Sequence, residues 1–167
     1  MANTFELIAS STVGAGGVSS IEFTSIASTW TDLVLVCSTR NTVAQTGDDV
    51  NLSINGSTSN FTFRYLYGNG SAASSASGST GYTGVTDAAN ATASTFGSMT
   101  IYIPNYAGST NKSISTDSVF ENNATTAGAM LLASLWSQTA AITSLRITGT
   151  SNFAQYSTAY LYGVKNA

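Results

Sequence analysis

The sequence predicts an all-β fold, an antiparallel β-sandwich of the jelly-roll type with about ten short strands. Three observations support this prediction. Apolar and polar side chains alternate with a period of two along most of the chain, helical spacing is almost absent, and Gly, Asn and Ser separate the alternating runs. A different Greek-key sandwich fits the same pattern, because periodicity does not distinguish the two topologies. The chain has 167 residues, which suits a single domain over 1–167.

The first half of the chain contains five runs with strand character. They cover residues 5–9, 18–23, 33–37, 50–54 and 61–67. In the first run, Phe5, Leu7 and Ala9 are expected to share one face. The run 33–37 is continuously apolar, as expected for a strand covered on both faces. The dipeptide Asn55-Gly56 marks a turn between the last two runs.

The second half contains five further runs. They cover residues 99–103, 114–120, 130–136, 145–148 and 159–164. Pro104 ends the first of them, since proline cannot donate a hydrogen bond to a strand ladder. The run 130–136 has residues that favour helix, but it is short and lies among strands, so we predict a buried strand.

Residues 69–95 break this pattern, because they are almost entirely Ser, Ala, Gly, Thr and Asn. We predict a long loop at about this position. It is either a loose surface loop or an extended arm that lies on a neighbouring subunit. Its large side chains, Tyr82 and Val85, are candidate interface residues, together with Trp30 and Tyr106.

The charge content is low. Charged residues make up 8% of the chain, with a formal net charge of −3, against about 25% charged residues in an average soluble domain. The few Lys and Arg are scattered, which argues against nucleic-acid binding. A surface of hydroxyls and amides is easier to desolvate than a charged one, and this indicates permanent assembly with other subunits. A secreted β-protein with a neutral surface is the alternative interpretation.

The sequence contains neither a secretory leader nor an apolar stretch of about 18 residues. We therefore expect synthesis and assembly in the cytoplasm, without a membrane partner.

Catalytic chemistry is not predicted. The chain has no histidine and one cysteine, Cys37, which excludes His-based acid–base schemes and an intrachain disulfide. The carboxylates show no spacing that pairs two of them, so we expect neither an enzyme nor a cofactor site. Asp48 and Asp49 are weak calcium candidates, and a turn before a strand is the preferred interpretation of these two residues.

Several segments together resemble a known family. They are ELIAS at 6–10, TVG at 12–14, WTDLV at 30–34, YGNGS at 67–71, IYIPNYAGS at 101–109, ENNAT at 121–125, LWS at 135–137, AAITS at 140–144, QYSTA at 155–159 and LYGV at 161–164. In these segments the chain resembles small virion proteins of tailed bacteriophages, notably phages of cyanobacteria and other aquatic bacteria.

The resemblance implies a structural protein of the virion, either a head decoration (cement) protein or a tail or fibre component. Our first expectation is a cement protein, a homotrimer that binds the major capsid protein on the outer capsid surface and stabilises the head. The alternative is a receptor- or glycan-binding module of a tail or fibre that uses loop tyrosines and Trp30 or Trp136. A polysaccharide-degrading enzyme is a third and weaker hypothesis.

Overall fold

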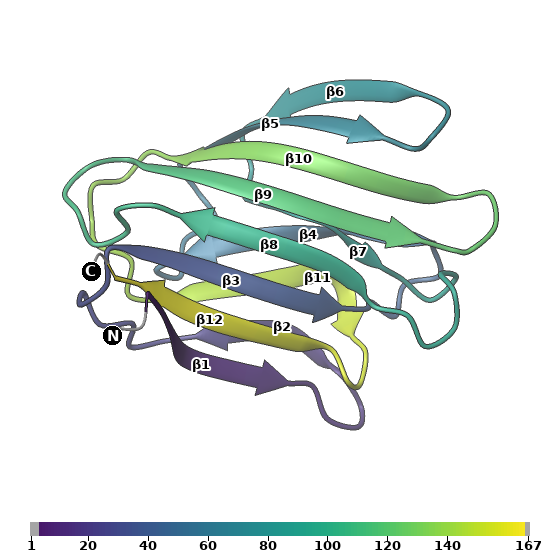
Figure 1. Ribbon diagram of the computed structural model, residues 1–167, viewed down its shortest axis with the longest axis horizontal. Helices are drawn as coiled ribbons and strands as arrows, with labels where there is room; N and C mark the ends of the chain where they lie inside the picture. Colours follow the sequence, from purple (N-terminus) through teal and green to yellow (C-terminus); the bar gives the residue numbers. More distant parts are fainter. Residues whose placement is uncertain (1–3, 166–167) are drawn as a thin grey trace.

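The computed structural model describes residues 4–165, which form 12 strands (Figure 1). The strands are β1 Phe5–Thr12, β2 Val18–Phe23, β3 Asp32–Thr39, β4 Gly47–Ile54, β5 Phe61–Gly68, β6 Ala73–Gly78, β7 Tyr82–Asp87, β8 Gly97–Ile103, β9 Lys112–Glu121, β10 Ala127–Trp136, β11 Leu145–Phe153 and β12 Thr158–Val164. No helix that could span a membrane occurs in this described part of the chain.

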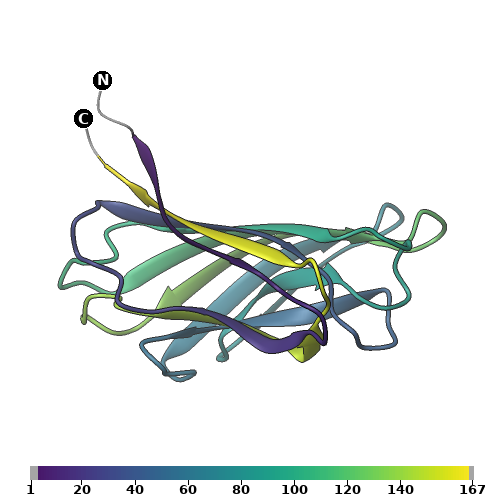
Figure 2. The same ribbon diagram turned by 90° about the horizontal axis from the view of Figure 1, so that it is seen from below.

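The strands form two antiparallel sheets that face each other (Figure 2). The larger sheet has eight strands in the order β1-β12-β3-β8-β9-β10-β5-β6, and the smaller has four in the order β2-β11-β4-β7. The set β1-β12-β3-β8 facing β2-β11-β4-β7 is an eight-stranded jelly roll. The predicted fold class is therefore confirmed, with 12 strands in place of about ten.

Two hairpins are inserted into this jelly roll. The β5–β6 hairpin lies between β4 and β7 in the chain, and the β9–β10 hairpin lies between β8 and β11. Both hairpins join the same edge of the larger sheet. The smaller sheet ends at β7, which packs against β8, β9 and β10. Figure 1 shows β5 and β6 continuing beyond it, so that part of the larger sheet has no sheet opposite.

The main core fills the space between the two jelly-roll sheets. Residues such as Leu35, Ile101, Leu52, Ile147 and Phe153 are at most 2% exposed there. A second cluster lies under the inserted hairpins, where three buried side chains are covered by partly buried aromatic ones. The buried members are Val85, Met130 and Leu132, and the aromatic members are Phe63, Tyr65, Tyr67, Tyr82 and Phe120.

Strand β10 confirms the predicted strand over 130–136. Its side chains alternate between buried and exposed along its whole length. It pairs with β9 on one side and β5 on the other, so neighbouring strands outweigh the helix propensity of its Leu, Met and Ala residues.

Strand β3 differs from its prediction. Leu33, Leu35 and Cys37 are buried in the core, and on the opposite side Val34 is 8% exposed whereas Val36 is 37% exposed. Burial on both faces therefore holds for residues 33–35 and fails at Val36.

Strand β1 also differs from its prediction. Phe5 and Leu7 are exposed, whereas Ala9 packs against the core together with Ile8. The pairing of β1 with β12 shifts register between Leu7 and Ala9. A bulge of this kind places an extra residue on one strand and changes which side chains point inward.

The predicted loop over 69–95 is wrong for much of its length, because it contains β6 and β7. β6 pairs with β5 in spite of its weak strand propensity. Gly78 lets β6 approach the ring of Phe63 closely, since a Cβ atom there would lie 2.6 Å from the ring and displace it. β7 pairs with β4, and its Val85 amide donates a hydrogen bond to the Ser118 hydroxyl of β9.

The residues that follow β7 are also held in place. The Arg40 guanidinium donates hydrogen bonds to carbonyl oxygens of this loop at 2.7 to 3.2 Å. Its acceptors are Ala89, Ala91, Thr92 and Thr95. The Arg40 side chain therefore holds the loop between β7 and β8 in place through its hydrogen bonds to the loop backbone.

The alternation of β10 gives a stability test on two adjacent leucines. Leu132→Ala should lower the free energy of unfolding by about 2–5 kcal/mol, because Leu132 is 1% exposed and its loss leaves a cavity. Leu131→Ala is the matched control, and it should change stability by no more than about 0.5 kcal/mol, because Leu131 is 58% exposed. Urea unfolding measures both. Reversed losses, with the larger one in Leu131→Ala, would mean that the register of β10 is wrong by one residue, and equal losses would contradict the alternation itself.

Candidate interaction surfaces

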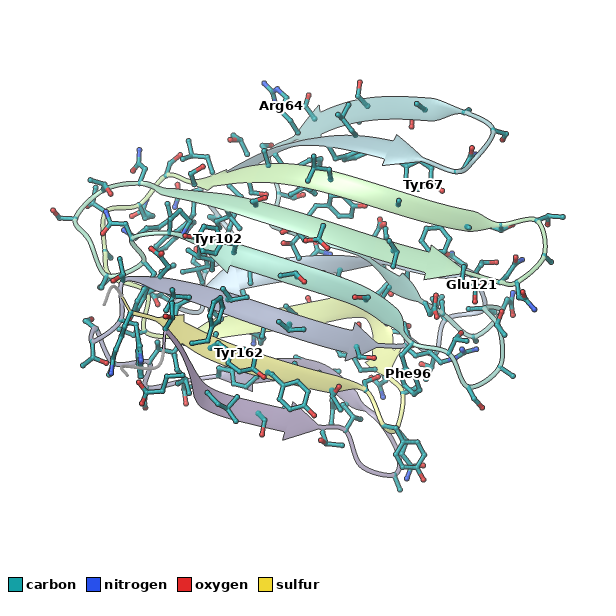
Figure 3. The ribbon with its side chains drawn as sticks, viewed as in Figure 1. Arg64, Tyr67, Phe96, Tyr102, Glu121 and Tyr162 are labelled. Atoms are coloured by element: carbon teal, nitrogen blue, oxygen red, sulfur yellow. The ribbon has the colours of Figure 1, made fainter. Side chains whose placement is uncertain are left out.

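The outer face is the side of the larger sheet that points away from the smaller sheet, and Figure 3 views the molecule onto it. Side chains at paired positions form continuous rows across the strands. One row consists of Tyr160, Val36, Thr100, Asp117, Leu131, Leu66 and Ser75, each paired with the next. A second row consists of Leu7, Tyr162, Val34, Tyr102, Ser115, Ala133, Arg64 and Ser77.

Large hydrophobic side chains are unusually exposed on this face. They are Phe5, Leu7, Val36, Leu66, Tyr102, Val119, Leu131, Leu135 and Tyr160. Many of the other positions carry Ser, Thr or Ala, as at Thr100, Ser115 and Ala133. A half-solvated antiparallel sheet normally has a polar outer side, so this composition points to a surface that is covered in its working state.

Charges are sparse on the outer face. Asp117 and Arg64 lie within its rows, on β9 and β5, and Glu121 lies on the same side at the last position of β9. The Asp32 carboxylate, at the first position of β3, accepts hydrogen bonds at 2.8 Å from the Tyr102 hydroxyl and from the Asn105 amide. Covering this face would therefore desolvate few ions, which removes the largest cost of burying a protein surface.

The inserted hairpins make the outer face concave at one end. Two adjoining hollows of about 610 and 430 Å³ lie over β5, β6, β9 and β10. Leu66 and Leu131 line both of them. The outer face therefore has a shallow apolar trough at the end that the inserted hairpins add.

A second surface, the aromatic cleft, lies on the opposite side of the larger sheet, where β5 meets the free edge of the smaller sheet. It has a volume of about 300 Å³, and its lining comes from β4, β5, β7 and the turn before β7. The lining residues are Asp49, Asn51, Phe63, Tyr65, Thr80 and Tyr82.

The rings of the aromatic cleft pack on one another. Phe63 and Tyr65 are stacked, with ring centroids 6.1 Å apart and ring planes 7° apart. Tyr82 is tilted against both, with centroids 5.1 Å from Phe63 and 5.8 Å from Tyr65. The three rings therefore pack as one cluster, and together they supply the aromatic part of the cleft lining.

The electrostatics of the aromatic cleft are set by burial. Partial burial raises the pKa of the Asp49 carboxyl and the neighbouring charge of Asp48 raises it further, whereas a hydrogen bond with Tyr82 opposes the shift. Burial also raises the pKa of the Tyr82 hydroxyl, and the Asp49 carboxylate adds to this shift. The Tyr82 hydroxyl consequently stays protonated around neutral pH and remains a hydrogen-bond donor.

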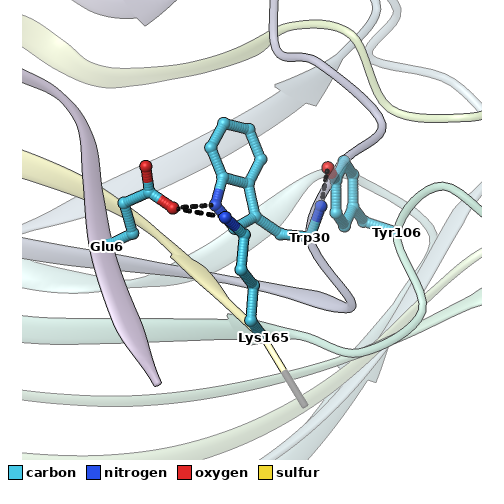
Figure 4. A network of polar contacts seen from close by, with 4 residues as sticks. All are labelled: Glu6, Trp30, Tyr106 and Lys165. Carbon is cyan, nitrogen blue, oxygen red and sulfur yellow. Dashed lines mark hydrogen bonds and ion pairs between the residues drawn. The ribbon is translucent and has the colours of Figure 1, made fainter. Parts of the chain in front are cut away.

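Trp30 and Tyr106, two predicted interface residues, belong to a network that joins the two ends of the chain (Figure 4). The Trp30 indole N–H donates to the Glu6 carboxylate at 3.0 Å, and the Lys165 ammonium lies 2.8 Å from the same oxygen. The Trp30 amide donates to the Tyr106 hydroxyl at 3.4 Å, and that hydroxyl donates to the Ala27 carbonyl. We call this set the terminal clip.

The predicted interface residues are thus not equally accessible. Tyr106 and Val85 are buried, so they belong to the interior of the folded chain and cannot form a surface contact. Trp30 is half-buried and packs on Gly163, where a Cβ atom would lie 2.2 Å from the indole. Tyr82 keeps accessible atoms and lines the aromatic cleft.

The two calcium candidates do not converge. Successive residues of a strand point to opposite faces, and accordingly Asp48 is buried whereas Asp49 is exposed. The Asp48 carboxylate accepts hydrogen bonds from the Thr150 amide at 2.9 Å and the Thr150 hydroxyl at 2.5 Å. Among residues 4–165 no group of three or more Asp, Glu, Cys or His side chains is placed to hold a metal ion.

Cys37, the cysteine of this chain, lies in the core, and burial raises the pKa of its thiol to about 12. A thiol with this pKa is not nucleophilic near neutral pH.

Sequence reasoning missed Phe63, Tyr65 and Asn51 as site residues. The available signal was the run Phe61, Phe63, Tyr65 and Tyr67, which places four aromatic rings on one face of a single strand. Comparisons of the chain with protein-family models, curated proteins and solved structures find no match.

The terminal clip predicts a titration at acidic pH. Hydrogen bonds from Lys165 and Trp30 hold the pKa of Glu6 below its ordinary value of 4.5. The clip is therefore intact above pH 4.5 and is lost as the pH falls through the lowered pKa of Glu6. The indole N–H resonance of Trp30 should move over this acid range in NMR spectra.

This titration has two controls, a second indole in the same protein and a variant without the carboxylate. The indole of Trp136 is buried without a hydrogen-bond partner among the described residues, so its resonance should stay in place. Glu6→Gln should remove the titration of the Trp30 resonance. If the Trp30 signal were constant in the wild type, or still titrated in the variant, the assigned network would be incorrect.

Proposed function

We propose that this chain is a structural protein of a phage virion, a decoration protein that docks through its outer face on the assembled capsid. Its partner in this proposal is the major capsid protein. The proposal rests on the sequence resemblance and on the character of the outer face. The comparisons with known proteins contribute nothing to it.

The observation that carries the proposal is the combination of exposed apolar side chains and scarce charges on the outer face. Soluble monomers rarely expose large contiguous apolar patches, and such patches usually mark interaction sites. The outer-face leucines and tyrosines can make dispersion contacts with a partner. Since only Asp117 and Arg64 lie within the rows described above, a partner surface needs little charge complementarity.

Stabilisation by such a protein needs no catalysis. A component that binds the assembled lattice, and not free capsid subunits, stabilises the assembled state by mass action. A closed homotrimer is the proposed assembly, because cyclic symmetry lets identical subunits satisfy identical sites on the lattice. In this arrangement the protein is assembled in the host cytoplasm and its final location is the capsid surface.

The jelly roll agrees with this function without establishing it. The same fold builds viral capsid domains and lectins, and a fold by itself does not determine a function. A position on a tail or fibre, with a receptor- or glycan-binding role, is the alternative. Electron microscopy of purified virions separates the two, because a decoration protein covers the head in many copies and a tail module is present in few.

The outer face supplies the decisive substitution. Leu131→Asp places a carboxylate between Leu66 and Asp117 on the outer face, where desolvating a second negative charge opposes docking. Added to heads prepared without the protein, the wild type should bind and raise the temperature at which DNA is released. The variant should lose most of this binding and this protection.

A control variant separates the outer face from a general effect of charge. Ser19→Asp adds the same carboxylate at an exposed position of β2 on the smaller sheet, and it should behave as the wild type. Thermal unfolding of the isolated proteins verifies that both variants are folded. Heads that gain no stability from the wild type, or that bind Leu131→Asp normally, would contradict the proposal.

A further inference from the structure

The aromatic cleft lies on the side of the sheet opposite the outer face, so a protein docked through the outer face keeps this cleft accessible. It exists because the inserted β5–β6 hairpin extends past the smaller sheet. Strand β4 of the smaller sheet contributes Asp49 and Asn51, and β5 of the larger sheet contributes Phe63 and Tyr65. Two sheets therefore supply two different chemistries to one cleft, carboxylate and amide from one and aromatic rings from the other.

We propose that the aromatic cleft binds one unit of a neutral saccharide. A sugar ring has an apolar face of C–H groups that packs on aromatic rings and hydroxyls that need donors and acceptors at its rim. The stacked Phe63–Tyr65 pair offers the aromatic wall. The Asp49 carboxylate, the Asn51 amide and the hydroxyls of Thr80 and Tyr82 offer the polar rim. This site is independent of the decoration function proposed above.

The size of the cleft fits this class of ligand. Its volume of about 300 Å³ is at the lower end of the roughly 300–1,000 Å³ found for ligand pockets. The cleft therefore accommodates one ring of a glycan while the rest of the chain extends into solvent.

The polar groups of the cleft have partners that a ligand can exchange with. The Tyr82 hydroxyl donates to the Met130 sulfur at 3.3 Å, and a thioether is a weak acceptor that a ligand oxygen can replace. The same hydroxyl also interacts with the Asp49 carboxylate, so a sugar hydroxyl bound between these two groups would take the place of that interaction. Thr80 accepts a long 3.4 Å hydrogen bond from the Tyr82 amide, so its hydroxyl proton remains free to donate. The raised pKa of Tyr82 keeps its hydroxyl a donor.

Other ligand classes fit less well. A quaternary ammonium needs aromatic rings arranged around an open space, whereas these three rings pack on one another at 5.1 to 6.1 Å. A phosphate or an acidic sugar would meet the Asp49 carboxylate, and the two charges would repel each other. Neutral hydroxylated rings avoid both problems.

The test begins with the full chain on a printed array of neutral and acidic glycans, with choline as a separate soluble probe. We expect binding to neutral glycans and none to choline. The best neutral oligosaccharide is then titrated by calorimetry against the wild type and the variants. Absence of any bound glycan, binding to acidic glycans alone, or binding of choline would overturn the proposal.

Three variants connect the binding to the cleft. Asp49→Ala should weaken binding about tenfold or more, because it removes a charged acceptor. Tyr82→Phe keeps the ring and removes the hydroxyl, and it should weaken binding by about three- to tenfold. Asp117→Ala, the matched loss of an exposed carboxylate on the outer face, should bind the glycan as the wild type does.

These variants test capsid docking and saccharide binding independently of each other. Asp49→Ala should still bind and protect heads, since Asp49 is not on the outer face, and Leu131→Asp should still bind the glycan. Unchanged glycan affinity in Asp49→Ala would place the saccharide elsewhere and overturn the assignment of the aromatic cleft.

Discussion

The unequal size of the two sheets is the constraint on which the rest of this structure depends. Four strands cannot cover eight, and side chains on the uncovered part of the inner side need another form of burial. The chain meets this need with aromatic residues on β5, β7 and β9, which close over Met130 and Leu132. Large flat rings cover much apolar surface per residue, and the hydroxyls of the tyrosines allow their edges to stay in contact with water.

The extension of the larger sheet by the two inserted hairpins generates both candidate surfaces. On the outer side it enlarges the weakly charged face and adds the trough shared by Leu66 and Leu131. On the inner side it brings β5 against the free edge of the smaller sheet and forms the aromatic cleft. Insertions into a rigid scaffold commonly carry function in this way, since the scaffold holds them in place without depending on their sequence. Within the described chain, the eight jelly-roll strands can be regarded as the scaffold and the two hairpins as its specialised part.

Period-two alternation made the strands predictable, because it reflects which side chains face a core. It located β10 in spite of its helix-favouring residues, and it indicated a two-sheet sandwich without distinguishing a jelly roll from another Greek-key topology. It failed for β6, whose Ala and Ser residues carry no apolar signal and which is a strand because β5 offers it a partner. It failed at β1 because a bulge shifts the register by one residue.

The candidate surfaces were less predictable than the strands. Alternation does not say which side of an apolar strand another sheet will cover, so Val36 was expected to be buried and is exposed. The aromatic cleft joins Asp49 and Tyr65 from strands of different sheets, and no local pattern specifies that contact. Tyr106 shows the opposite error, since it was a candidate interface residue and its ring is in fact buried in the core.

The central claim is that the outer face is covered in the assembled particle. Hydroxyl-radical footprinting of the free protein and of intact virions measures this directly, because it reports the solvent accessibility of individual side chains. The account predicts strong labelling of Leu66 and Leu131 in the free protein and their protection in virions, with Val18 on the smaller sheet labelled in both. Equal labelling of Leu66 and Leu131 in the two samples would contradict it.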